Sequence, residues 1–150
     1  MTAKTVVYTC GCFDMFHVGH LNVLQGARAL GDRLIVGVST DELVERHKPG
    51  SLVIPFEHRM AIIKAIKYVD MAVPQTDRDK FLAWQKLKFD ILVVGDDWFG
   101  KKSFNEYEKK LINKGVKVVY LPYTQGISST ELRTIFEARV HDRFIANVGT

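Results

Sequence analysis

Two histidines, His17 and His20, stand three residues apart in the stretch 11–20, with Gly19 between them. The stretch follows a short apolar run and precedes a helix-patterned segment, Leu21–Leu30. A helix N-terminus exposes unpaired N–H groups at the positive end of its dipole and therefore attracts phosphate. Histidines three apart lie near one another on a helix, and a glycine between them lets the backbone approach a polyphosphate closely. The pattern predicts a phosphate-binding site where a strand turns into a helix.

Other groups along the chain extend this prediction to a larger anion. Lys48 and Arg59 are cations, and arginine can bind phosphate with two parallel hydrogen bonds. Residues 126–130 resemble a second helix start rich in hydroxyl groups. Two such sites facing one crevice suit a triphosphate. Transfer of a phosphoryl or nucleotidyl group needs aligned reactants and positive charge placed near the transition state, and these residues supply both.

Taken singly, several of these residues have ordinary structural explanations as helix caps, turn residues or solvated charges: His17, His20, Asp41, Lys48, Asp96, Ser128 and Ser129. Asp14 can hold the glycine turn together through its own backbone while it also orients a metal-bound phosphate. Because the whole set falls where predicted strands end, we interpret it as one ligand site.

Length and composition indicate one soluble globular domain, residues 1–150. The chain is 47% hydrophobic and 25% charged, with a formal net charge of +4. Its basic residues form no long run, which argues against a nucleic-acid partner and suits small anionic ligands. It has no apolar stretch of about 20 residues and no signal peptide, so we expect neither membrane contact nor export. Cys10 and Cys12 are expected to be reduced thiols in a cytoplasmic protein.

Alternating strands and helices predict an α/β fold, a Rossmann-like doubly wound sheet of about five parallel strands with flanking helices. The expected strands are Val6–Tyr8, Leu34–Val38, Met71–Val73, Ile91–Val94 and Val116–Leu121. The expected helices are Leu21–Leu30, Phe56–Tyr68, Lys80–Leu87, Asn105–Lys114 and one from Ser129 to about Val140. Ligands of such sheets bind beyond the carboxyl ends of the strands. Glu45–Pro55 is expected to be a loop that acts as a lid over this crevice.

At this point the sequence resembles the cytidylyltransferases of the H-x-G-H nucleotidyltransferase superfamily, most of all those that act on glycerol 3-phosphate. The matching stretches, in family order, are 11–20 (G-C-F-D-M-F-H-V-G-H), 30–41, 56–59 (F-E-H-R), 67–70 (K-Y-V-D), 95–98 (G-D-D-W) and 124–130 (T-Q-G-I-S-S-T). The resemblance implies that CTP and a small phosphorylated alcohol, by first choice glycerol 3-phosphate, react to a CDP-alcohol and pyrophosphate. It also implies assistance by Mg²⁺, direct attack of the acceptor phosphate on the α-phosphorus, and a homodimer.

The resemblance and the residue analysis together assign three groups of site residues. The catalytic group is His17, His20 and Lys48. The CTP-binding group is Cys12, Phe13, Asp14, Gly19, Arg59, Gly95, Asp96, Tyr123, Thr124, Gly126, Ile127, Ser128, Ser129 and Thr130, with Asp14 touching the metal only through phosphate. The acceptor-binding group is Lys48, Lys67, Asp70, Arg78 and Lys80.

Two positions depart from the family pattern. Lys67 stands where the family has arginine, and Tyr123 stands where an arginine helps to hold phosphate. Arg78 and Lys80 follow the third predicted strand and can supply replacement charge for an acceptor phosphate. The acceptor therefore stays open: an amino-alcohol phosphate or a sugar-derived phosphate is an alternative, as is an adenylyltransferase of the same fold. A catalytically silent nucleotide-binding module is a third alternative, and the intact His17, Gly19 and His20 argue against it.

Overall fold

A computed structural model of the chain, describing residues 3–95, 102–122 and 124–148, contains a five-stranded parallel sheet. Its strands are β1 (Val6–Gly11), β2 (Arg33–Ser39), β3 (Met71–Gln75), β4 (Ile91–Gly95) and β5 (Lys117–Leu121). The spatial order is β3-β2-β1-β4-β5, so the chain winds outward from β1 in both directions. This confirms the predicted fold class, and it places the end of β1 at the point where the winding reverses, the usual ligand position in such sheets.

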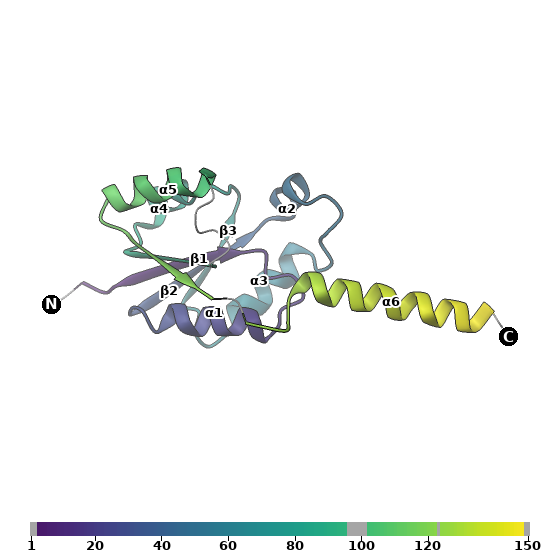
Figure 1. The fold of residues 1–150 in the computed structure, drawn as a ribbon. Helices are drawn as coiled ribbons and strands as arrows, with labels where there is room; N and C mark the ends of the chain where they lie inside the picture. Colours follow the sequence, from purple (N-terminus) through teal and green to yellow (C-terminus); the bar gives the residue numbers. More distant parts are fainter. Residues whose placement is uncertain (1–2, 96–101, 123, 149–150) are drawn as a thin grey trace.

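Helices cover both faces of the sheet (Figure 1). α1 (Val18–Arg28) and α3 (Phe56–Ala65) lie on one face, and α4 (Lys80–Leu87) and α5 (Lys102–Asn113) lie on the other. α2 (Asp41–His47) follows β2, and α6 (Ser129–Val148) follows β5 and runs away from the sheet toward the C-terminus. None of these helices is long and apolar enough to span a membrane over the stretches that the structure describes.

Alternation along the strands supplies a hydrophobic core to each face. Val7 and Leu24 belong to the cluster under α1 and α3, whereas Tyr8 and Leu92 belong to the cluster under α4 and α5. All four side chains are 0% exposed. The two buried layers fix the sheet, and with it the loops at its carboxyl edge.

Tyr8 reaches across the sheet toward its edge strand. Its ring stacks on Phe89 at 4.8 Å, and its hydroxyl donates to Gln75 on β3. The side chain passes over Gly37 of β2, where a Cβ atom would overlap the Tyr8 hydroxyl. A glycine is therefore required at position 37.

The predicted elements differ from the observed ones at their ends and in one helix, α2, that was not predicted. α2 occupies Asp41–His47, so the expectation of a loop from Glu45 was wrong for its first three residues. Thr40 caps this helix with its side chain, which accepts a hydrogen bond from the Leu43 N–H. A helix of only seven residues shows too little apolar periodicity to be predicted from the sequence. β3 continues through Pro74, which is tolerated because β3 is an edge strand.

Candidate active site

The turn between β1 and α1 is strained and held from several sides. Phe13 and Met15 have positive φ angles of 56° and 49°, which side chains disfavour. Asp14 is only 2% exposed, and its two carboxylate oxygens accept hydrogen bonds from the backbone N–H groups of Val53 and Ile54, at 2.9 and 2.8 Å. The Asp14 carboxylate thus ties the turn to the segment that precedes α3, rather than to the backbone of its own turn as the sequence predicted.

Arg59 stabilises the same region from inside the protein. Its guanidinium donates to the backbone oxygens of Ile54, Cys12 and Ser39, and it pairs with Asp41 at 2.8 Å. The Arg59 side chain is 0% exposed. This corrects the sequence-based assignment of Arg59 to CTP phosphate: the residue is a buried cross-link among three loops at the carboxyl edge.

His17 and His20 together cap the start of α1. His17 is the N-cap residue, and its Nδ1 accepts from the Gly19 N–H at 3.0 Å, while His20 Nδ1 accepts from the His17 N–H at 3.2 Å. The two rings stack with centroids 3.9 Å apart. A Cβ on Gly19 would lie 2.7 Å from His17 Cε1, so only glycine leaves room for this ring. His17 and His20, which the sequence assigned to the site, are thus also the residues that cap α1.

The hydrogen bonds at Nδ1 also settle which nitrogen carries the proton. A nitrogen that accepts from a backbone N–H cannot itself be protonated, so in each neutral ring the proton is on Nε2. Burial lowers the pKa of His17, and burial together with His17 lowers the pKa of His20 to about 4, against a smaller opposing effect of Asp14. Both rings are therefore neutral near pH 7, and each presents an Nε2–H donor.

The start of α6 lies against this turn. Thr124 Oγ1 accepts from Asn22 Nδ2 of α1 at 2.9 Å, and Ser129 Oγ donates to the Asp14 carbonyl at 2.5 Å. Ser128 caps α6, since its Oγ accepts from the Glu131 N–H. The structure thus brings together two helix N-termini, as the sequence predicted. The hydroxyls of Ser128 and Ser129 already have protein partners, so the N–H groups of the first turn are the better anion donors.

The remaining assigned residues of this edge are placed as follows. Phe13 packs its ring against His20 with centroids 5.5 Å apart, and Cys12 has a half-buried thiol whose pKa burial raises. Gly95 ends β4, and Gly126 has a φ of 80° in the turn before α6. Ile127 is half-buried and Thr130 is exposed. The predictions for Asp96 and Tyr123 lie outside the described residues.

Two exposed cations stand at the rim. Lys48 is the C-cap residue of α2 and is exposed, and Ser51 Oγ donates to its carbonyl. Arg78 follows β3, and its Nη1 lies 3.3 Å from Nδ1 of His47, the last residue of α2. The loop after β3 and the end of α2 are therefore neighbours at the carboxyl edge.

Three residues assigned to the acceptor occupy other places. Lys67 and Asp70 precede β3 and so lie at its amino end, where Asp70 Oδ2 accepts from the Leu34 N–H and pairs with Arg28 at 3.3 Å. Lys67 is exposed there, with its ammonium 5.2 Å from the Tyr68 ring centroid. Lys80 begins α4 and is 6% exposed, so it is not an exposed rim cation. Lys67 and Asp70, which the sequence assigned to acceptor binding, therefore lie at the edge of the sheet opposite the histidines, and the structure does not bring the two groups together.

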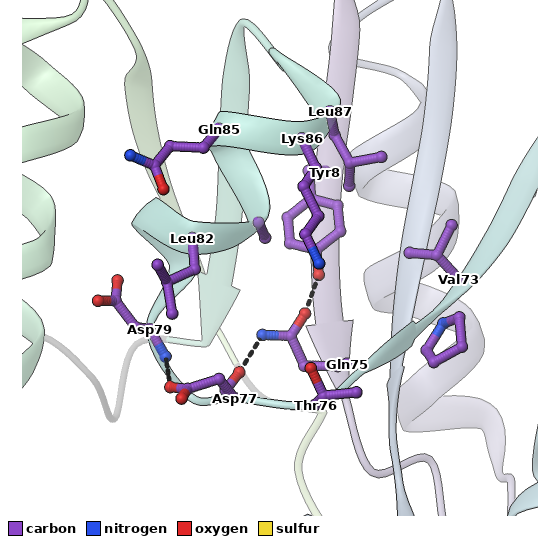
Figure 2. A pocket seen from close by; sticks show the side chains of 12 residues that line it. Tyr8, Val73, Gln75, Thr76, Asp77, Asp79, Leu82, Gln85, Lys86 and Leu87 are labelled. Carbon is purple, nitrogen blue, oxygen red and sulfur yellow. Dashed lines mark hydrogen bonds between the residues drawn. The ribbon is translucent and has the colours of Figure 1, made fainter.

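A cavity of about 530 Å³ lies between β3 and α4 (Figure 2). Gln75 is one of the residues that line it, accepting from the Tyr8 hydroxyl and donating to the Asp77 carbonyl. Its lining includes none of the residues assigned to substrate. The cavity is a feature of the α4 face and is separate from the histidine site.

The fold and the histidine turn together define a class of protein: a doubly wound domain with two neutral histidines and two helix N-termini at one edge of its sheet, an arrangement suited to an anionic ligand. Residues 8–135 match the family model described as cytidylyltransferase-like, and the chain belongs to this family. This confirms the resemblance drawn from the motifs.

Individual relatives agree with this membership. A glycerol-3-phosphate cytidylyltransferase of Bacillus spizizenii is 40% identical over 85% of this chain and 93% of its own length. An ethanolamine-phosphate cytidylyltransferase of Arabidopsis thaliana is 37% identical over 84% of this chain, which spans 31% of that relative. The crystal structure of a lipopolysaccharide core biosynthesis protein from Thermoplasma volcanium superimposes with a TM-score of 0.66 at 27% identity, covering 81% of this chain and 98% of that one.

Arg133 is a candidate site residue that the sequence analysis missed. It lies one turn into α6, and its Nη2 is 3.6 Å from Asp14 Oδ2. An arginine four residues after a helix start is a weak signal in a sequence, because most such side chains are solvated. Its proximity to the histidine turn follows only from the way α6 is docked.

Proposed function

We propose that this chain transfers the cytidylyl group of CTP to a small phosphorylated alcohol, with glycerol 3-phosphate as the first candidate. A phosphate oxygen of the acceptor attacks the α-phosphorus of CTP, and the bond from that phosphorus to the bridging oxygen of the β-phosphate breaks. The products are a CDP-alcohol and pyrophosphate. The observation that carries this proposal is the stacked pair of neutral, Nε2-protonated imidazoles at the start of α1.

The histidine pair suits charge that develops in the transition state. Two Nε2–H donors on stacked rings can bind oxygens of the same phosphate region, and the N-terminus of α1 adds its own N–H groups and dipole. The rings need not change protonation state during turnover, since no proton has to move for one phosphate to displace another. Hydrogen-bond donors fixed in this way act mainly on the rate, because they match the transition state better than the ground state.

The fixed geometry of the pair comes from its surroundings. Asp14 and Arg59 anchor the turn that precedes the histidines, through buried bonds to the segment before α3. Phe13 and Phe16 flank His20 with ring centroids 5.5 and 5.4 Å away. These contacts position the rings before substrate arrives, which is the condition for efficient electrostatic stabilisation.

The rim cations are the better candidates for the acceptor phosphate. Lys48 and Arg78 are both exposed at the carboxyl edge, and Arg78 offers a planar fork that a lysine lacks. We propose that Lys48 closes over bound substrate with residues 49–52, since the segment is anchored at its far end by Asp14.

Mg²⁺ is proposed to enter together with CTP. Over the ranges that the structure describes, His, Cys, Asp and Glu side chains do not gather in groups of three that could hold a metal ion. Both oxygens of the Asp14 carboxylate accept backbone N–H groups, so Asp14 touches such an ion only through phosphate. Mg²⁺ commonly keeps several waters and binds through substrate phosphates, and we treat it as part of the substrate. We further propose a cytoplasmic homodimer.

A pyrophosphate-release screen tests the proposed function. The purified chain is mixed with CTP or ATP and with glycerol 3-phosphate, ethanolamine phosphate or a sugar phosphate, and the organic product is identified by mass spectrometry. We expect release with CTP and glycerol 3-phosphate, accompanied by CDP-glycerol. Equal turnover with ATP, or release with CTP that is independent of every acceptor, would refute the proposal.

A further inference from the structure

A basic face forms at the amino edge of the sheet, opposite the edge that carries the histidines. The helices α1, α3, α4 and α5 all end at this edge, and each has a basic residue in its last turn. Figure 1 shows the N-terminus at this edge, whereas α6 leaves from the other, so α6 does not cover the face. The basic face comprises Lys4, Arg28, Arg33, Lys64, Lys67, Lys86, Lys88, Lys110, Lys114 and Lys117.

Backbone hydrogen bonds hold the strand starts of this edge side by side. The Arg33 N–H donates to the Thr5 carbonyl and so joins the starts of β1 and β2. The Lys117 N–H donates to the Asp90 carbonyl and so joins the starts of β4 and β5. Neighbouring strands lie about 4.8 Å apart, so five strand starts in register extend over about 20 Å. The cations along this edge therefore form one broad surface.

The carboxylates of the same edge leave most of these cations without a partner. Asp32, Asp70 and Asp90 each accept, at 2.7 to 2.8 Å, a backbone N–H near the start of a neighbouring strand. Arg28 pairs with Asp70, and no other cation of the basic face forms an ion pair with a carboxylate of the described residues. Ten cations and three carboxylates give this edge a larger positive charge than the whole chain, whose formal net charge is +4.

Helix dipoles explain only part of this charge. A cation in the last turn stabilises the negative end of a helix, which accounts for one basic residue in each of the four helices. Five cations stand outside the helices and have no such role: Lys4, Arg33, Lys67, Lys114 and Lys117. Because like charges on one face repel one another, these five call for an anionic partner outside the chain.

We propose that the basic face docks the protein on a membrane surface of anionic lipids. Eight of its ten cations are lysines, which attract lipid headgroups as point charges and lack the planar fork with which arginine reads a base. Leu30 and Met71 are 39% and 38% exposed at the same edge and reach the headgroup region beside the lysines. The inference goes beyond the proposed function, and docking leaves the histidine turn open to solution because that turn lies at the opposite edge.

Membrane contact was not expected from the sequence, because the basic residues form no long run along the chain. The residues of the basic face lie between positions 4 and 117, and only the parallel arrangement of the strands brings them to one edge. A polybasic surface assembled by the fold attracts anionic lipids by the same electrostatics as a polybasic segment.

Sedimentation with lipid vesicles tests the proposal on the full chain. We expect the chain to bind vesicles that mix phosphatidylcholine with phosphatidylglycerol, to ignore vesicles of phosphatidylcholine alone, and to dissociate as salt is added. In the double variant Lys4→Gln/Lys117→Gln the affinity should fall about 25-fold, about fivefold for each lysine. The matched control is Arg46→Gln/Arg139→Gln, which removes the same charge from exposed positions on α2 and α6 and should stay within about twofold of the parent chain.

Labelling of lysine amines in the parent chain, read by mass spectrometry, locates the contact directly. Phosphatidylglycerol vesicles should protect Lys114 and Lys117 and leave Lys48, at the carboxyl edge, as reactive as before. Protection of Lys48 instead, or a control variant that loses as much affinity as Lys4→Gln/Lys117→Gln, overturns the proposal. So does a parent chain that binds duplex DNA or an acidic polypeptide through these lysines but not the vesicles. Melting curves accompany the variants, and if the double variant does not fold, the labelling of the parent chain decides.

Discussion

Replacement of Arg59 by methionine tests whether this residue stabilises the fold or binds phosphate. The side chain is fully buried and donates four hydrogen bonds, to the backbone oxygens of Ile54, Cys12 and Ser39 and to Asp41. Without Arg59 the three backbone oxygens lose their donor, at about 1–3 kcal/mol for each one left unsatisfied, and we expect Arg59→Met to lower the free energy of unfolding by about 4 kcal/mol. For a domain of this size the midpoint should fall by about 10 °C.

A second arginine provides the matched control. Arg28 also pairs with an aspartate, Asp70, but its side chain is 36% exposed, and surface pairs contribute about 1 kcal/mol or less. Thermal unfolding of Arg59→Met and Arg28→Met is followed by circular dichroism, without ligand. If Arg59→Met melts within about 3 °C of the parent chain and instead loses CTP affinity, the buried cross-link has been misread and Arg59 is a phosphate ligand after all.

Four further predictions concern turnover, the pH dependence of stability, closure and the acceptor. His17→Ala and His20→Ala should each lower kcat by about 10²–10³ with little change in the KM for CTP, and near-native kcat would contradict their role. The free energy of unfolding should also depend on pH, because the pKa of His20 is about 4 in the folded chain and 6.5 in the unfolded chain. This contribution to stability is complete above pH 6.5 and falls by up to about 3 kcal/mol as the pH drops toward 4. A free energy of unfolding that does not change with pH in the parent chain, measured against His20→Ala, would count against a neutral ring. Amides 48–52 should gain protection from hydrogen exchange when CTP and Mg²⁺ bind, and unchanged exchange would exclude a lid. Arg78→Ala should raise the KM for the acceptor while Lys67→Ala leaves it unchanged, and the reverse pattern would return Lys67 to the site.

Much of the fold was predictable because its signals are local. Continuous apolar runs separated by helical periodicity gave all five strands, and the residues at the end of β1 gave the histidine turn. The contacts between the two histidines were also predictable, since their spacing and the glycine between them act within one helical turn.

The errors in the site have physical reasons. A sequence shows that Arg59 is a cation, but not that three backbone carbonyls and a carboxylate surround it. For Lys67 and Asp70 a usable signal was present: both precede a strand, and the rule that places ligands at carboxyl ends excludes them. Arg133 needed the docking of α6 against Asp14, a contact between residues more than a hundred positions apart.

The central claim is that this chain joins CTP to an alcohol phosphate by direct displacement at the α-phosphorus. A ³¹P NMR time course on the purified chain with CTP, glycerol 3-phosphate and Mg²⁺ tests it most directly. The account predicts that the CTP resonances disappear at the same rate as those of a CDP-alcohol diphosphate and of pyrophosphate appear, one of each for every CTP consumed. CTP consumed to orthophosphate and CDP, or CTP left intact, would contradict it.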